Sequence, residues 1–195
     1  GTQFPAENIR KTDDVQSFDF YIKEAGQAEG TKFSTVSLKQ VSLSNCQNAL
    51  FGLALTLVFS HDLKPAVEAL ADLKLTSGRQ EEVRLSAGNL LINDAYNASP
   101  ESMKSAFELL DVLSREGNYD GTLAILGGVN ELGPLAPALH LDIGRALGRV
   151  KPDRTWLVGP WAQTLARGLE ETDPDASYKI FEDTEALLSF IEKEA

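Results

Sequence analysis

Two hydrophobic periods divide the chain. Up to about residue 40, short apolar runs alternate with turn signals, as in residues 18–22 and 35–38, and this predicts a few antiparallel strands. From Asn45 onward, apolar residues recur every three or four positions, which predicts an amphipathic helix followed by a second helix over residues 63–73. Because the Thr-Ser-Gly-Arg stretch at 76–79 breaks this pattern, we place a domain boundary after Gly78.

Beyond this boundary, strand and helix patterns alternate. Strands are predicted over residues 83–86, 90–93, 122–126, 156–158 and 178–181, and helices over about 103–113, 134–147, 161–169 and 184–191. Strands separated by helices of this length form a parallel sheet, so we expect an α/β fold with a Rossmann-like, mostly parallel sheet flanked by helices. The continuous apolar run at 122–126 predicts a strand buried on both faces.

The most informative segment is the predicted strand, loop and helix start over residues 91–103. Asp94 ends the strand, and Ser99-Pro100-Glu101 has the capping hydroxyl, early proline and early acid of a helix N-terminus. In open α/β sheets ligands bind at the carboxyl ends of strands, where we also expect the glycines at 127, 128 and 159. Asp94 is therefore placed either to accept hydrogen bonds from ribose hydroxyls or only to cap an amide of its own loop.

Composition narrows the class of partner. The 195 residues carry a net charge of −11, which argues against sequence-independent nucleic-acid binding and against anionic membranes. The longest apolar run, around residues 49–59, is too short to cross a bilayer, and no signal-peptide pattern opens the chain. A single cysteine, Cys46, fits a reducing compartment, so we expect a cytoplasmic protein that acts on small molecules and neither binds nucleic acid nor inserts into membranes.

Three stretches resemble a known family. The sequence LINDAYNASPESM at 91–103, together with LAILGGVNELG at 123–133 and ALHLDIG at 138–144, resembles the carboxyl-terminal domain of the Mur ligases. Upstream, SNCQNALFGLALTL at 44–57 is similar to a helix at the end of that family's central ATPase domain, and Gly78-Arg79 is similar to its interdomain Gly-Arg pair. The likeness extends over nearly the whole chain.

The resemblance implies both organisation and activity. Residues 1–78 would be the incomplete carboxyl-terminal part of the central domain, with short antiparallel strands, and residues 79–195 the carboxyl-terminal domain. The similarity is greatest to family members that add D-alanyl-D-alanine to UDP-N-acetylmuramoyl-tripeptide in peptidoglycan synthesis. In such enzymes ATP, with Mg²⁺, phosphorylates the tripeptide carboxylate and the dipeptide amine attacks the acyl phosphate.

The same resemblance implies nucleotide-binding residues. Asn45 and Asn48 match asparagines near the adenine, and Arg79 and Asp94 match residues that hold the ribose. Two amides suit the edge of a purine, and an arginine and an acid suit a diol. Judged on the residues alone, Asn45 is a helix cap and Asn48 belongs to an exposed polar face.

The loop after Asp94 is implied to bind the other substrate. Tyr96, Asn97 and Ser99 match residues near the incoming amino substrate, which would be D-alanyl-D-alanine. Turn formation is the alternative role for these residues, because asparagine and serine are common in turns.

Several features depart from the family. Ser44 stands in place of a histidine, Ser99 replaces an asparagine, and Gly128-Val129 occupies the position of an Asp-Met pair. The sequence contains no GxxxxGK[ST] motif, and neither the carbamylated lysine nor the magnesium ligands of the family are found in it. We therefore expect no catalytic residue and no metal site in this chain, no tightly bound cofactor, and no ligase activity from the chain alone.

Two alternatives stay open. The departures at 44 and 128–129 are compatible with a non-catalytic relative that binds a nucleotide, peptide or protein, whereas a dinucleotide-binding domain is disfavoured because no GxGxxG follows a predicted strand. The two histidines are far apart, which excludes a structural zinc site. We expect His61 in an exposed turn and His140 in a structural role within a helix, and we expect Glu131 to be a solvated acid near a helix start.

Overall fold

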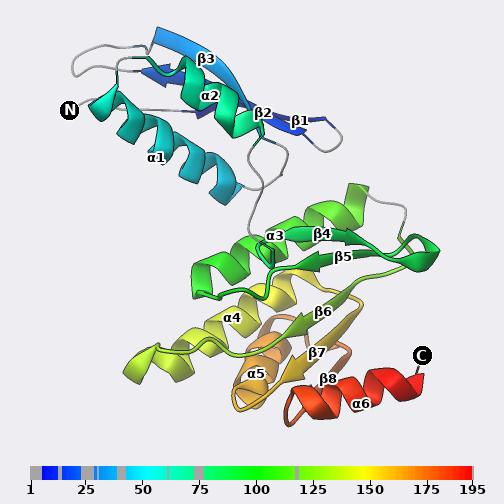
Figure 1. The fold of residues 1–195 in the computed structure, drawn as a ribbon. Coiled ribbons are helices and arrows are strands. Elements are labelled where there is room, and N and C mark those ends of the chain that lie inside the picture. The colour runs from blue at the N-terminus through cyan, green and yellow to red at the C-terminus, as the bar shows by residue number, and fades with distance from the viewer. Residues whose placement is uncertain are drawn as a thin grey trace. The chain divides into compact units, whose positions relative to one another are not determined.

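The fold consists of two compact units. A computed structural model describes residues 6–12, 15–22, 29, 31–38, 43–60, 62–72, 77–116 and 119–194. Contacts between Cα atoms separate Gly1–Leu75 from Thr76–Ala195. Figure 1 shows the elements of each unit. Among the described residues, no helix has the length and apolar character needed to cross a membrane.

The first unit is an antiparallel sheet with two helices. Strands β1 (Ala6–Thr12), β2 (Val15–Ile22) and β3 (Thr31–Leu38) pair in the order β1-β2-β3, as the alternating pattern predicted, and helices α1 (Leu43–Phe59) and α2 (Lys64–Ala71) follow. Side chains at every second strand position form the core together with one face of the helices. The buried hydrophobic residues of this cluster, among those that the structure describes, are Phe18, Phe20, Val36, Leu38, Ala49, Leu53 and Leu63.

The second unit confirms the predicted α/β class. Its elements are β4 (Glu81–Arg84), the short 3₁₀ helix η1 (Ser86–Gly88), β5 (Leu90–Asn93), α3 (Pro100–Glu116), β6 (Leu123–Leu126), the 3₁₀ helix η2 (Gly133–Leu135), α4 (Ala136–Val150), β7 (Arg154–Val158), α5 (Ala162–Thr172), β8 (Tyr178–Phe181) and α6 (Thr184–Glu194). Strands β6, β7 and β8 form a parallel sheet in that order, each joined to the next by a helix.

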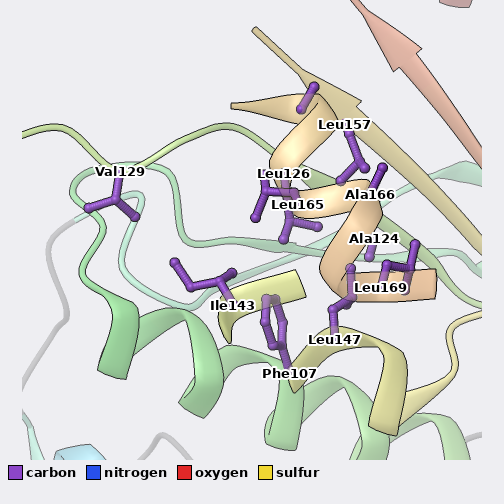
Figure 2. Packing of buried hydrophobic residues seen from close by; sticks show 11 residues of the cluster. Phe107, Ala124, Leu126, Val129, Ile143, Leu147, Leu157, Leu165, Ala166 and Leu169 are labelled. Carbon is purple, nitrogen blue, oxygen red and sulfur yellow. The ribbon is translucent and has the colours of Figure 1, made fainter. Parts of the chain in front are cut away.

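The core of this unit lies between the parallel sheet and helices α3, α4 and α5. Phe107 points from α3 toward Ile143 and Leu147 on α4, and α5 adds Leu165 and Leu169 (Figure 2). Helices α4 and α5 are in backbone contact, because a Cβ atom at Gly144 would lie 2.2 Å from the carbonyl oxygen of Leu165. Glycine at this position is therefore required by packing.

Two predictions about strands are corrected. Strand β5 pairs antiparallel with β4, because residues 85–89 make too short a connection for a parallel crossover. In the described part of the chain, these two strands form a sheet of their own beside the parallel sheet of β6, β7 and β8. Strand β6 is an edge strand and is not buried on both faces, since Ala124 and Leu126 are buried while Ile125 is 47% exposed. The arrows of β5 and β6 nevertheless point in the same direction, so the carboxyl ends of these two strands lie on the same side (Figure 1).

Candidate functional site

The helix start at Ser99 has the predicted geometry. The Ser102 amide donates to Ser99 Oγ at 3.1 Å, and the Ser99 amide donates to Ser102 Oγ at 2.9 Å. Pro100 opens α3, where its missing N–H costs no helical hydrogen bond. Ser99 Oγ accepts the bond that caps α3, which leaves its hydroxyl proton and a second lone pair for a substrate.

Asp94 is tied to the segment that precedes β4. Its Oδ1 accepts a hydrogen bond from the backbone N–H of Gln80 at 3.0 Å, while Oδ2 has no hydrogen-bond partner among the described residues. Partial burial raises the pKa of the Asp94 carboxyl, and the Gln80 amide and the positive charge of Arg79 oppose this shift. Both expected roles are thus compatible with the geometry: one oxygen binds a loop amide, and the other remains available to a ligand hydroxyl.

Arg79 and Tyr96 are in direct contact. The Arg79 guanidinium carbon lies 4.8 Å from the centroid of the Tyr96 ring, which is a cation–π arrangement. The backbone N–H of Tyr96 donates to the Gly78 carbonyl at 2.9 Å. A residue implied for the ribose and a residue implied for the dipeptide therefore lie side by side in the second unit.

Glu81 holds this corner together, although no motif in the sequence marks it. Its Oε2 accepts hydrogen bonds from Ser77 Oγ at 2.7 Å, the Gly78 amide at 2.9 Å and Asn93 Nδ2 at 3.3 Å. The bond from Ser77, with those from Gly78 and Asn93, holds the pKa of Glu81 below its usual range. The only sequence signal was an acid four residues after a serine, across a glycine turn.

The remaining predicted residues are less constrained. Asn97 is exposed, and its side chain has no hydrogen bond to the described part of the chain. Asn48 lies on an exposed face of α1, while the side chains of Asn45 and Ser44 lie outside the described residues, as does His61. Asn45 and Asn48 belong to the first unit, so the implied adenine contacts and ribose contacts are on different units.

His140 has the structural surroundings that we expected. It is fully buried, its Nε2 accepts a hydrogen bond from the Val129 amide at 2.9 Å, and its Nδ1 lies 2.7 Å from the Ala136 carbonyl. A backbone amide can only donate, so the proton of the ring is on Nδ1. The Nε2 bond therefore holds the turn after β6 against α4, and the Nδ1 bond, to a carbonyl of the same helix, fixes the orientation of the ring.

The same histidine accounts for the small residue at 128. Its ring stacks on Trp161 with centroids 4.3 Å apart and planes inclined by 8°. A Cβ atom at Gly128 would lie 2.6 Å from Trp161 Cδ1 and 3.2 Å from His140 Nε2. Here the indole fills the space that a side chain at 128 would need. Glu131, a little further along the loop, is exposed, as expected, and has a left-handed backbone with φ of 63°.

Arg79 and Asp94 carry groups of the kind that bind a polar ligand. No three His, Cys, Asp or Glu side chains come together as ligands in the part of the chain that the structure describes. Arg79 offers planar donors and Asp94 offers an acceptor, which together fit a vicinal diol such as a ribose. Aromatic and polar groups from Tyr96 and Asn97 lie on the adjoining loop.

Comparison with known proteins identifies the family. Residues 78–195 match the profile described as Mur ligase, glutamate ligase domain. The chain is 32% identical over 157 residues to a UDP-N-acetylmuramoyl-tripeptide–D-alanyl-D-alanine ligase of Bacillus subtilis, covering 77% of this chain and 34% of that protein. It is 24% identical over 192 residues to the enzyme of the same name from Haemophilus influenzae, covering 98% of this chain and 38% of that one.

A solved structure shows the same fold. A crystal structure of MurF from Acinetobacter baumannii superimposes with a TM-score of 0.75 at 26% identity, over 98% of this chain and 38% of that chain. The chain thus spans little more than a third of the length of the relatives that it matches. It belongs to the Mur ligase family, whose glutamate ligase domain matches residues 78–195.

Proposed function

We propose that this chain is part of an ATP-dependent ligase that joins D-alanyl-D-alanine to UDP-N-acetylmuramoyl-tripeptide in the cytoplasm. Residues 1–78 would complete a central ATPase domain and residues 79–195 would form the carboxyl-terminal domain. The proposal is supported by the family match and by relatives that carry this name. The observation that carries it is the meeting of Arg79, Asp94 and Tyr96 at one corner of the second unit.

The residues at this corner would act by binding and orientation. Arg79 and Asp94 would hold the ribose of the nucleotide, and Asn45 and Asn48 would lie near the adenine. Tyr96, Asn97 and Ser99 would orient the dipeptide so that its amine faces the activated carboxylate. Bound ATP, with Mg²⁺, supplies the phosphoryl group that activates the tripeptide carboxylate. Correct placement of an amine and exclusion of water account for large rate effects without a catalytic side chain from this chain.

The proposal is tested with the full-length protein that contains this chain. We expect ATP-dependent phosphate release that requires both UDP-N-acetylmuramoyl-tripeptide and D-alanyl-D-alanine, together with the ligated product in mass spectra. The 195-residue chain alone, as a control, should release none, because its sequence has no phosphate-cradling GxxxxGK[ST] loop. Dipeptide-independent phosphate release by the full-length protein, or ligation by the chain alone, would contradict the proposal.

One observation favours a second candidate, a non-catalytic module that binds a nucleotide or peptide. Gly128 replaces the acid that the family resemblance implies, and the Trp161 and His140 rings leave no space for a side chain there. A module of this kind would bind an adenosine nucleotide, as measured by calorimetry, yet the full-length protein would release no phosphate with both substrates present.

A further inference from the structure

Two segments of the second unit are fastened to each other, and we call them the clasp: residues 77–80 before β4 and residues 94–96 after β5. Two backbone amides cross between them, Tyr96 N–H to the Gly78 carbonyl at 2.9 Å and Gln80 N–H to Asp94 Oδ1 at 3.0 Å. The Arg79 guanidinium over the Tyr96 ring is the third contact. The clasp therefore joins Arg79 and Asp94, which are implied for the nucleotide, to Tyr96, which is implied for the dipeptide.

The backbone of the clasp is fixed. Gly78 has a φ of +78°, and a Cβ atom there would meet Tyr96 Cβ at 3.2 Å and Tyr96 N at 3.3 Å. Glu81 binds both Ser77 and the Gly78 amide. With the backbone held from both ends, the exposed Arg79 and Tyr96 side chains are the parts of the clasp that can respond to a ligand.

The Arg79 guanidinium can contact the Tyr96 ring and a ligand at the same time. Its central carbon lies over the Tyr96 ring, 4.8 Å from the ring centroid, and a guanidinium carries its five N–H donors around the periphery of a planar group. A ligand held by the edge donors would therefore fix the arginine without displacing it from the ring. An ordered guanidinium in turn restricts the exposed Tyr96 ring to the stacked orientation.

We propose that the Arg79–Tyr96 cation–π contact couples the two substrate sites, so that nucleotide bound at Arg79 positions Tyr96 for the dipeptide. This inference depends on the proposed ligase function. Coupling between binding sites is reciprocal, so the dipeptide strengthens nucleotide binding by the same factor. A cation–π contact at an exposed site contributes about two- to fivefold to an equilibrium constant, and this is the size of coupling expected.

The test measures a coupling ratio in the full-length protein. This ratio is the Kd for nucleotide without the dipeptide divided by the Kd with the dipeptide. Calorimetry gives the Kd of a non-hydrolysable ATP analogue with UDP-N-acetylmuramoyl-tripeptide present, first without and then with saturating D-alanyl-D-alanine. We expect the dipeptide to lower this Kd about two- to fivefold in the wild-type protein. Tyr96→Leu should reduce the ratio to about one, and Tyr96→Phe should restore it because the ring is retained.

The Arg79→Lys variant tests the coupling independently of the Tyr96 variants. An ammonium group has no flat face and no planar edge, so it cannot stack and bind a diol in the same position, and the ratio should again fall to about one. Tyr119→Leu is the matched control, since it makes the same change at a tyrosine outside the clasp, and it should keep the wild-type ratio. Folding of each variant is checked by tryptophan fluorescence.

The outcomes separate this inference from the proposed function. If the wild-type protein ligates the dipeptide but its ratio is one, or if Tyr96→Leu keeps the wild-type ratio, the coupling is refuted and the ligase function stands. If the wild-type protein binds no nucleotide and releases no phosphate, the proposed function itself fails.

Discussion

At the residue scale, we expect the charge of Asp94 to matter for nucleotide binding and not for the stability of the fold. Burial raises the pKa of this carboxyl, so its contribution to stability is present at low pH and is lost as the pH rises through the folded-state pKa. At neutral pH the ionised group is thus a small cost to the fold. Asparagine at this position keeps an oxygen that can accept the Gln80 N–H and carries no charge.

We therefore expect Asp94→Asn to leave the free energy of unfolding at pH 7 within about 0.5 kcal/mol of wild type, with any change toward greater stability. Under the proposed function, nucleotide binding to the full-length protein should weaken about tenfold or more, because a hydrogen bond to a charged acceptor is lost. Urea unfolding and calorimetry give the two quantities. Asp120→Asn, at an exposed position, is the control; a large loss of stability in Asp94→Asn would show that the carboxylate is structural.

For His140 we expect the opposite result, a loss of stability when the side chain is replaced. Its replacement by alanine removes the acceptor of the Val129 amide and leaves a space beside Trp161. An unsatisfied buried donor and a cavity together cost about 2 to 4 kcal/mol of unfolding free energy, measurable by urea titration. His140→Gln keeps an oxygen that can accept the Val129 N–H, so its loss should be smaller. Equal losses in the two variants would mean that the hydrogen bond contributes little.

At the scale of elements, the contact between α4 and α5 depends on glycine. A Cβ atom at Gly168 would lie 2.1 Å from the Leu141 carbonyl oxygen, and backbone on the facing helix cannot yield as a flexible side chain does. Alanine favours a helix by about 1 kcal/mol relative to glycine, but forcing two helices apart costs about 3 kcal/mol. We expect Gly168→Ala to lose about 2 kcal/mol of unfolding free energy, measured by urea titration.

Gly52→Ala is the matched control for this prediction. Gly52 lies inside α1, and a Cβ atom there would have no neighbour within 4 Å among the residues that the structure describes. The substitution should stabilise the first unit by about 0.5 to 1 kcal/mol, because only the helix preference changes. A neutral or stabilising Gly168→Ala would show that the two helices can separate without loss.

Local pattern predicted most elements but not their partners. The period of apolar residues placed β8 at the observed bounds and α1 within two residues of its start, because each pattern reflects one buried face. It did not show that β5 pairs with β4 outside the parallel sheet, since an apolar period indicates a strand but not the strand that it pairs with. Nor did it show that Ile125 is exposed, because an apolar run looks the same in edge and central strands.

The same limit applies to the candidate site. Asp94 and the Ser99 cap were predictable because strand ends and helix starts have local signals. The role of Glu81 was not predicted, because its hydrogen bonds to Ser77, Gly78 and Asn93 join residues on both sides of a hairpin. Contacts of this kind have no period and arise only when the chain has folded.

At the scale of the whole molecule, the two compact units predict two unfolding transitions. Each unit has its own buried cluster, one centred on Phe18 and Phe20 and the other on Ile143 and Leu157. A unit with its own core can unfold cooperatively by itself, whereas one shared core would give a single transition.

The chain offers a probe that sees only one of these transitions. Both tryptophans, Trp156 and Trp161, lie in the second unit, so indole fluorescence reports its unfolding alone, while far-ultraviolet circular dichroism reports both units. In urea we expect one fluorescence transition and a circular dichroism curve with two steps, one of which coincides with it. Gly168→Ala should move the transition of the second unit, seen by both probes, to lower urea concentration. Gly52→Ala should move only the transition of the first unit, seen by circular dichroism alone, to higher urea concentration. If both probes gave one coincident transition that moved with either variant, the two units would fold as a single cooperative domain.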